Sequence, residues 1–427
     1  MHDEISKRYV GFLLTGIGLA SFGFGLILAY VVVYLHDARG IGLGVAGVCL
    51  AGAGVSGLVF SLAAGTFIDR FGALRAIEVG MLTEAAAGVA ISAVHNAPEA
   101  FAALTLAGAA DAIFWPAQAA LIVAVVPERL RTRGFAWQFM VLNGGIGLGG
   151  LVSGSVIHLY QASSYVHVYL AEATILVLAP ILIAVGFRGF RPSPLEQSPQ
   201  DRGSDLRRLL RYREVFSDRR FRAFLTVNLG FAFFGYAQLN AGWAAYATGY
   251  GGATPRVVGL AFGANTGVIV AAQMFVVSRV DRFARSKALA LAATGWVLSW
   301  IMAFVASFAT FRGAPADIIL VASLGVFGLA ETVYSPVSSA LTNDLAPPRL
   351  RGRYNAVASS AFAGAGLLAS PIAGVLLATG DSFAWTMPLI FGCGALSLLA
   401  LRLSRVLPKS INHPSNGFGP NRASQED

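Results

Sequence analysis

Charged residues are scarce in this chain of 427 residues. Asp, Glu, Lys and Arg together make up 12% of the sequence, against 56% hydrophobic residues, and the mean hydropathy is +0.66. Water-soluble globular proteins carry about 25% charged residues. The composition therefore excludes an ordinary water-soluble protein and predicts an integral membrane protein.

Cysteine is almost absent as well. Cys49 and Cys393 both lie within apolar runs, so they cannot build a disulfide framework and are predicted to be small packing residues. The six histidines lack metal-ligand spacing, and the phosphate-binding pattern G-x-x-x-x-G-K-[ST] does not occur. We therefore predict that the protein is not an enzyme, binds no metal or cofactor, and does not use ATP.

Long apolar runs fill the chain instead. Each is long enough to cross a hydrocarbon core of roughly 30 Å as a helix, and none alternates with period two as a membrane strand would. The predicted fold class is an all-α integral membrane protein with twelve transmembrane helices. The runs are about 9–35, 43–67, 74–94, 100–126, 134–160, 165–187, 221–247, 256–278, 288–311, 316–343, 355–379 and 384–406.

The second half of the chain repeats the first. Gly47 is matched by Gly259 and Asp69 by Asp281, both 212 positions later, and PERLRTR at 127–133 is matched by PPRLRGR 220 positions later. We predict two pseudo-symmetric six-helix halves. The predicted units are a first half (1–187), a linker with an amphipathic surface helix (188–220), a second half (221–406) and a disordered cytoplasmic tail (407–427).

The net charge of +9 is distributed unevenly between the two sides of the membrane. Of 31 Lys and Arg residues, 28 fall on the side of the termini, and Arg39, Arg256 and Arg312 fall on the other. The positive-inside bias predicts that both termini are cytoplasmic in a multi-pass protein of the cell inner (plasma) membrane. The basic excess indicates contact with the lipid bilayer and not with nucleic acid.

The loop after the second run resembles the signature of the major facilitator superfamily, G-x-x-x-D-R-[FY]-G-x-[RK]-[RK]. The matching residues are Gly65, Asp69, Arg70, Phe71, Gly72 and Arg75. The second copy keeps Asp281, Arg282 and Lys287, but Val277 and Ala284 replace its glycines. The resemblance implies the twelve-helix fold of that family and a conformational latch at these two loops.

The latch also has a physical basis in the residue types. Gly65, without a Cβ, allows another helix to approach closely. Asp69 at the membrane edge can accept hydrogen bonds from basic residues or from a helix N-terminus in one conformation only. The alternative is that these are loop charges that only set the topology.

Four acidic residues lie within the apolar runs, at positions 84, 111, 172 and 331. A charge at mid-membrane costs about 2.5–3.5 kcal/mol and marks a functional site by default. We predict Asp111 and Glu331, which share a repeat position 220 apart, and then Glu84 as proton-coupling candidates, and rank Glu172 below them. The alternative for each is a structural carboxyl group.

The remaining candidates are polar and aromatic residues on the fourth, seventh and tenth runs, which line the central cavity in the resembling family. Aromatic side chains with a few amides suit a partly apolar solute. Aromatic side chains that face lipid or a neighbouring helix are the alternative. The substrate-cavity candidates are Trp115, Gln118, Tyr334, Ser338, Gln238, Asn240 and Phe234.

Exporters of the resembling family carry a small-residue pattern with a proline in the fifth span. Here Gly145, Gly149, Gly150 and Gly154 preserve the small residues, but the proline is absent, and Leu104 stands where such exporters have an arginine. We predict a monomeric secondary transporter that uses a proton gradient to export hydrophobic or amphipathic small molecules. Proton-coupled uptake of a small polar nutrient and a non-transporting membrane sensor are the alternatives.

Overall fold

The computed structural model describes residues 2–126, 131–189, 213–280, 283–347 and 350–413. Within these ranges every regular element is a helix, and ten helices are long and apolar enough to cross a membrane. The predicted all-α membrane fold is therefore confirmed.

The first half forms a bundle that we call the amino-terminal bundle. Its first span comprises α1 (His2–Leu28), α2 (Val31–Val33) and the π-helical η1 (Tyr34–Ala38). The other five spans are α3 (Leu43–Phe71), α4 (Ala73–Ser92), α5 (Ala97–Val125), α6 (Arg131–Val156) and α7 (Ala162–Gly186).

The second half forms the carboxy-terminal bundle. Its first span comprises α9 (Arg219–Phe231), the π-helical η4 (Ala232–Tyr236) and η5 (Leu239–Trp243), and α10 (Ala244–Gly249). The other five spans are α11 (Pro255–Val280), α12 (Arg285–Ala306), α13 (Ala314–Leu345), α14 (Arg351–Leu377) and α15 (Ser382–Arg402). The short helices are η6 (Ala309–Phe311), η8 (Leu403–Arg405) and α16 (Lys409–Asn412).

The first span of the carboxy-terminal bundle departs from the regular helix that its apolar run predicts. Two π-helical segments interrupt it, and each contains a glycine that lies against a tryptophan. Gly235 faces the Trp296 ring and Gly242 faces the Trp385 ring, with no room for a Cβ at either position. The bulky rings of α12 and α15 thus pack directly on the backbone of this span, and π-helical turns of this kind are frequent at functional sites.

Two predictions outside the bundles have different outcomes. Residues 190–212, which contain most of the predicted amphipathic helix, lie outside the described residues. The tail beyond residue 407 is not disordered throughout, because Lys409–Asn412 forms α16. The Asn412 side chain accepts a hydrogen bond of 3.0 Å from the Ser286 backbone N–H, which satisfies an otherwise orphaned donor at the start of α12.

The two bundles are joined where α6 meets α11 and where α3 meets α14. A Cβ at Gly259 of α11 would lie 2.5 Å from the carbonyl oxygen of Gly150 and 3.1 Å from the Cα of Gly154. A Cβ at Gly47 of α3 would overlap the carbonyl oxygen of Ser370 on α14. Both joints are therefore backbone against backbone, as small residues allow between membrane helices.

The sequence repeat relates these two joints to each other. Gly47 and Gly259 are 212 residues apart, and their partners Gly150 and Ser370 are 220 residues apart. The α3–α14 joint and the α6–α11 joint are therefore repeat-equivalent contacts between the halves. Tyr30 adds a hydrogen bond of 2.9 Å from its hydroxyl to the Pro255 carbonyl across the α6–α11 joint.

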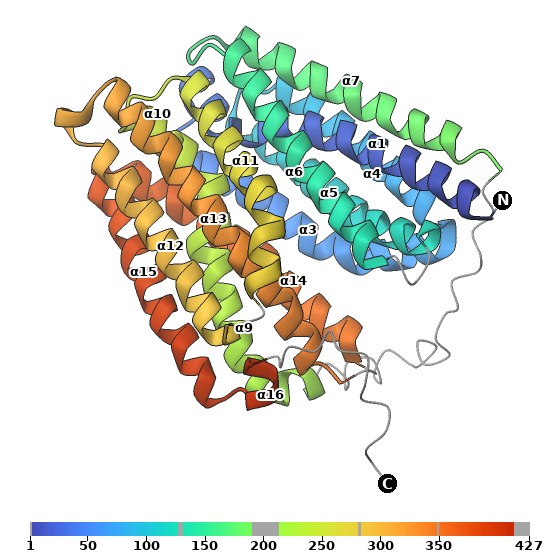
Figure 1. Ribbon diagram of the computed structural model, residues 1–427. Coiled ribbons are helices and arrows are strands. Elements are labelled where there is room, and N and C mark those ends of the chain that lie inside the picture. Colours follow the sequence, from blue (N-terminus) through green and yellow to red (C-terminus); the bar gives the residue numbers. More distant parts are fainter. Residues whose placement is uncertain (1, 127–130, 190–212, 281–282, 348–349, 414–427) are drawn as a thin grey trace.

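Both joints lie away from the chain termini. Gly47 and Gly259 stand near the beginnings of α3 and α11, which start on the side opposite the termini. Toward the termini the bundles diverge as the two legs of a V (Figure 1), and large apolar side chains on the same helices become exposed, such as Phe60 (45%) and Phe275 (60%). The protein is therefore closed on the side opposite the termini.

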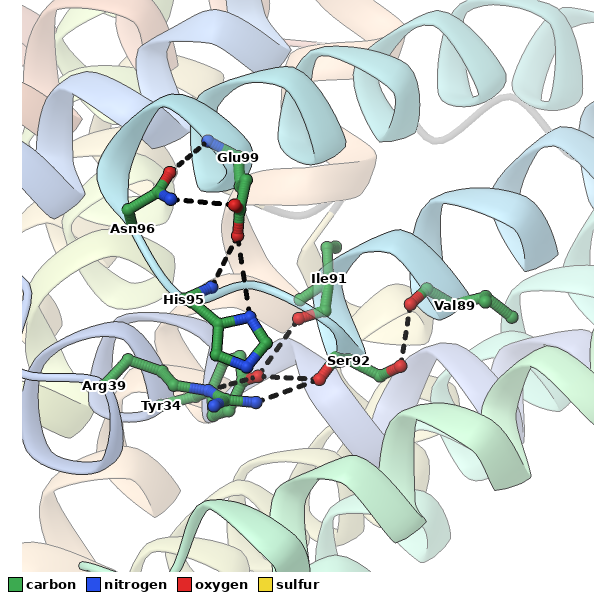
Figure 2. A network of polar contacts seen from close by, with 8 residues as sticks. All are labelled: Tyr34, Arg39, Val89, Ile91, Ser92, His95, Asn96 and Glu99. Atoms are coloured by element: carbon green, nitrogen blue, oxygen red, sulfur yellow. Dashed lines mark hydrogen bonds and ion pairs between the residues drawn. The ribbon is translucent and has the colours of Figure 1, made fainter.

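A polar network holds the amino-terminal bundle together on this closed side (Figure 2). Arg39 donates from Nε to the Tyr34 hydroxyl (2.8 Å) and from a terminal nitrogen to the Ser92 carbonyl (3.0 Å). The Tyr34 hydroxyl lies 3.1 and 3.2 Å from the carbonyl oxygens of Ile91 and Ser92. These carbonyls lie at the carboxyl end of α4, the negative end of the helix dipole, so a cation is favourable here.

The same network includes the start of α5 (Figure 2). The Glu99 N–H donates to Asn96 Oδ1 (3.0 Å), and Glu99 Oε2 accepts a hydrogen bond of 2.7 Å from the His95 backbone N–H. This reciprocal pattern is a capping box, which satisfies two backbone donors at once. It fixes the turn between α4 and α5, the two helices that carry Glu84 and Asp111.

Arg39→Gln is expected to lower the free energy of unfolding by about 1–3 kcal/mol, because it removes two charge-assisted hydrogen bonds. Thermal denaturation of the purified protein in detergent measures the loss. Arg312→Gln is the control, because Arg312 is exposed on the same side of the carboxy-terminal bundle. Equal effects of the two changes would show that the network in Figure 2 contributes nothing specific.

Candidate functional site

A small cavity lies inside the amino-terminal bundle, with a volume of about 30 Å³. Its polar lining comes from Ser21 of α1, Glu84 of α4 and Asp111 of α5. The volume is enough for about two water molecules. Two of the three predicted proton-coupling carboxyl groups therefore line the same cavity.

Asp111 stands at the edge of this cavity. Its Oδ1 accepts a hydrogen bond of 3.1 Å from Nε1 of Trp115, one turn later on α5. Asp111 is partly exposed and Trp115 is 40% exposed. Asp111 thus connects the interior of the bundle with its surface, whereas Oε2 of Glu84 is buried without a hydrogen-bond partner.

Gln118, the next residue on this face of α5, is fully buried. Its Oε1 accepts a hydrogen bond from Nε2 of Gln138 on α6, and its own Nε2 has no partner. The structure therefore places Gln118 between two helices of the bundle, while Trp115 is the predicted cavity residue of α5 that reaches the surface.

Asn228 of α9 organises the polar groups of the carboxy-terminal bundle. Its Oδ1 accepts hydrogen bonds from the Tyr334 hydroxyl (2.6 Å) and from the Ser338 hydroxyl (2.9 Å). Its Nδ2 donates to the Ala358 carbonyl of α14 (3.2 Å). Tyr334 and Ser338 are buried, so in this conformation their polar groups link helices and do not face a solute.

Glu331 lies one turn before Tyr334 on α13 and interacts with the hydroxyl group of Tyr236 in η4. The Tyr236 ring contacts Trp296 edge to face at 5.4 Å and Phe362 at 5.5 Å between centroids. Tyr236 also lines a pocket between the two bundles. Glu331 is thus connected through one aromatic hydroxyl to the space where the halves meet.

The pocket between the bundles has a volume of about 180 Å³. Leu50 of α3 lines one side, and Tyr236, Asn240, Phe362 and Ser370 line the other. Drug-sized ligands occupy pockets of roughly 300–1,000 Å³. This mostly apolar pocket with one amide therefore fits a small apolar solute or the apolar part of a larger one.

The other two candidates from this span lie elsewhere. Gln238 is buried, and its Oε1 accepts a hydrogen bond of 2.9 Å from Nε1 of Trp385 on α15. The Phe234 ring packs against Gly392, also on α15. Of the three candidates on this span, Phe234, Gln238 and Asn240, it is Asn240 that lines the pocket between the bundles.

A sequence profile of the Major Facilitator Superfamily matches residues 13–252 and 239–424. The chain belongs to this superfamily. The protein is therefore a multi-pass membrane transporter.

Related transporters extend over nearly the same length. An uncharacterized MFS-type transporter YttB of Bacillus subtilis (strain 168) is 24% identical over 375 residues, which cover 87% of this chain and 88% of the relative. A Na(+), Li(+), K(+)/H(+) antiporter of Planococcus maritimus is 25% identical over 411 residues, 90% of this chain and 92% of the relative.

Solved structures share the architecture. A bacterial homolog of the human lysosomal transporter Spinster, in an inward-facing and unoccupied conformation, superposes with a TM-score of 0.70 at 12% identity. The match covers 93% of this MFS chain and 97% of that one. At this identity the likeness concerns the fold alone.

The signature of the superfamily lies where α3 gives way to α4. Gly72 ends α3 with φ +86°, a value that favours glycine, and Arg70 stacks over the Phe71 ring at 5.3 Å. Arg75 and the repeat-related Lys287 are exposed. The side-chain surroundings of Gly65 and Asp69 lie outside the described part of the structure. Asp281 and Arg282 lie outside it as well. The latch therefore stays a prediction.

The structure also brings forward residues that the sequence ranked low. Glu172 of α7 is fully buried beside the other carboxyl groups, although its only signal in the sequence is an acidic residue in an apolar run. In the sequence, Tyr236 and Asn228 are only two among several polar and aromatic residues of their span, because their importance depends on distant partners such as Glu331 and Tyr334.

Proposed function

We propose that this transporter works by alternating access and exports hydrophobic or amphipathic small molecules in exchange for protons. The observation that carries the proposal is the pair of repeat-related carboxyl groups, Asp111 and Glu331, one in each bundle. Each is partly buried beside an aromatic hydrogen-bonding group, Trp115 or Tyr236. A carboxyl group in such surroundings can bind a proton in one conformation and release it in the other.

The joints between the bundles support alternating access. They close the protein on one side only, through glycine contacts that hold two helix pairs together without interlocking side chains. The 28 basic residues assign the termini to the cytoplasm. On this assignment the present conformation is open toward the cytoplasm.

The pocket between the bundles supports an apolar solute. Its lining is mainly aromatic and aliphatic, with Asn240 as an exposed amide. Such a lining holds a solute by burial of apolar surface and leaves few polar groups to satisfy.

A second candidate is the exchange of monovalent cations for protons. Three carboxyl groups, Glu84, Asp111 and Glu172, interact within the amino-terminal bundle, and no base enters their interactions among the described residues. The antiporter from Planococcus maritimus is named for such an exchange. Carboxylate oxygens are suitable ligands for hard cations.

Transport into energised inside-out vesicles tests the proposal. Vesicles that contain the protein are expected to accumulate a lipophilic dye when they pump protons inward, and a protonophore should abolish the accumulation. Radioactive sodium serves as the second solute, and vesicles without the protein are the control.

Each outcome selects one function. Dye accumulation supports proton-driven export, whereas sodium accumulation without dye supports the second candidate. Proton-driven accumulation of a polar nutrient in right-side-out vesicles alone indicates uptake. Absence of any net flux in both orientations would contradict transport and favour a sensor.

A further inference from the structure

Glu172 of α7 occupies an unusual place for a carboxyl group. Its side chain is fully buried, and neither carboxyl oxygen has a hydrogen-bond partner. It lies between two glycines, because a Cβ at Gly88 of α4 would be 2.9 Å from Glu172 Oε2 and a Cβ at Gly23 of α1 would be 3.6 Å from Glu172 Cγ. The two neighbouring helices therefore leave room for this carboxyl group.

Glu172 does not stand alone. Its carboxyl group interacts electrostatically with those of Glu84 and Asp111, so three helices each contribute one acid. Oε2 of Glu84 is also buried without a partner. Glu84 and Asp111 both line the small cavity, which is large enough for water.

Among the described residues, no basic group enters the interactions of these three carboxyl groups. Beyond Glu172, α7 contributes Tyr169, whose buried hydroxyl group has no partner and which interacts with Glu172 and Tyr34. Arg39 contacts Tyr34, but its guanidinium group is bonded at the closed surface to Tyr34 and Ser92. From α1 the polar group is Ser21.

Three ionised carboxylates cannot remain together in such a space. An isolated charge in apolar surroundings is strongly unfavourable and is neutralised by a proton or a counter-ion. Like charges add to this cost. One proton neutralises each acid without further ligands, whereas a single metal cation would leave the cluster negative.

We propose that Glu84 and Glu172 form a proton-binding site inside the amino-terminal bundle, and that this site exchanges protons with the space between the bundles through Asp111. Glu172 holds the innermost proton, and water in the small cavity connects Glu84 with Asp111. The role of this site in transport rests on the proposed proton coupling. The binding of protons to the site does not.

The dependence of thermal stability on pH tests the site without a transport assay. The folded protein should bind more protons than the unfolded chain, so its stability should fall as the pH rises above the ordinary range of glutamate. Glu172→Gln imitates the protonated side chain permanently. The variant should match the parent at acidic pH and exceed its melting temperature at alkaline pH by roughly 1 °C, the effect of about a fivefold change in the folding equilibrium of a chain of this length.

Controls and a second readout keep the test decisive. Glu78→Gln changes a partly exposed carboxyl group near the start of α4 that interacts with Arg75, and it should flatten the pH dependence less than Glu172→Gln does. Infrared spectra should show the C=O band of a buried protonated acid in the parent, weakened in Glu84→Gln and in Glu172→Gln. If Glu172→Gln does not fold, the spectrum of Glu84→Gln decides.

Two results would overturn the proposal. One is a parent protein whose stability rises with pH and whose spectrum lacks the protonated band, because the acids are then ionised. The other is stabilisation by sodium chloride, but not by choline chloride, at alkaline pH, because the ligand is then a metal cation. If the proton-binding results hold and the vesicle assay fails, the proposed transport function is at fault and the site is not.

Discussion

Gly259→Ala is expected to slow the transport cycle by roughly 5- to 150-fold and to shift the protein out of the conformation described here. The added Cβ would lie 2.5 Å from the Gly150 carbonyl oxygen, 3.0 Å from the Tyr30 hydroxyl oxygen and 3.1 Å from the Gly154 Cα. Backbone atoms cannot rotate away as a side chain can, so α6 and α11 must separate. Overpacking of this kind costs about 1–3 kcal/mol, which corresponds to that range of population shift.

The same helix offers a matched control. A Cβ at Gly267, two turns further along α11, would meet no atom within 4 Å. Gly267→Ala should therefore leave the transport rate unchanged or slightly stabilise the helix. Transport rates in vesicles compare the two variants. Equal rates would mean that the α6–α11 joint does not have to close during the cycle.

Neutralising the coupling carboxyl group should abolish proton-driven accumulation altogether. Asp111→Asn or Glu331→Gln imitates the protonated acid, which then has no proton to release, while the pocket between the bundles is left intact. The variant should still exchange labelled for unlabelled substrate across the membrane without a proton gradient. Vesicles with and without an imposed gradient measure the two activities.

The two carboxyl groups need not contribute equally. One-for-one exchange needs a single proton acceptor, so one of the two substitutions can leave accumulation intact. Glu78→Gln again serves as the control, because Glu78 lies near the start of α4, where it interacts with Arg75. Retained accumulation in both Asp111→Asn and Glu331→Gln would exclude proton coupling at these positions, and Glu84 would be tested next.

The fold was predictable because a membrane imposes strong constraints on sequence. Runs of about 20 apolar residues have few alternatives to a spanning helix. The sequence repeat, in which Gly259 matches Gly47, indicates two equivalent halves. The irregular span between Arg219 and Gly249 was not predictable, because its π-helical turns pack against tryptophans of α12 and α15, which lie far along the chain.

The site was predictable only in part, for a related reason. Acidic residues in apolar runs are visible in the sequence, so Asp111, Glu331 and Glu84 could be named. Which of them share a cavity depends on how helices rotate about their axes, and the apolar runs carry no clear periodicity that fixes this rotation. Gln238 shows the consequence: its amide faces Trp385 inside the bundle, whereas Asn240, two residues later, lines the pocket.

Distances between spin labels on the two bundles test alternating access most directly. One pair, Tyr160→Cys and Thr254→Cys, reports the closed side, and another, Phe135→Cys and Phe275→Cys, reports the side of the termini; all four residues are exposed. The native Cys49 and Cys393 are buried, and labelling of the parent checks that they do not react.

These distances are to be measured in lipid nanodiscs at acidic and at alkaline pH. Alternating access coupled to protons predicts opposite changes, so that the distance between positions 160 and 254 lengthens as that between 135 and 275 shortens. Gly259→Ala should show the same change without a change of pH. Two distances that stay fixed, or that lengthen together, in a protein that still transports would contradict the account.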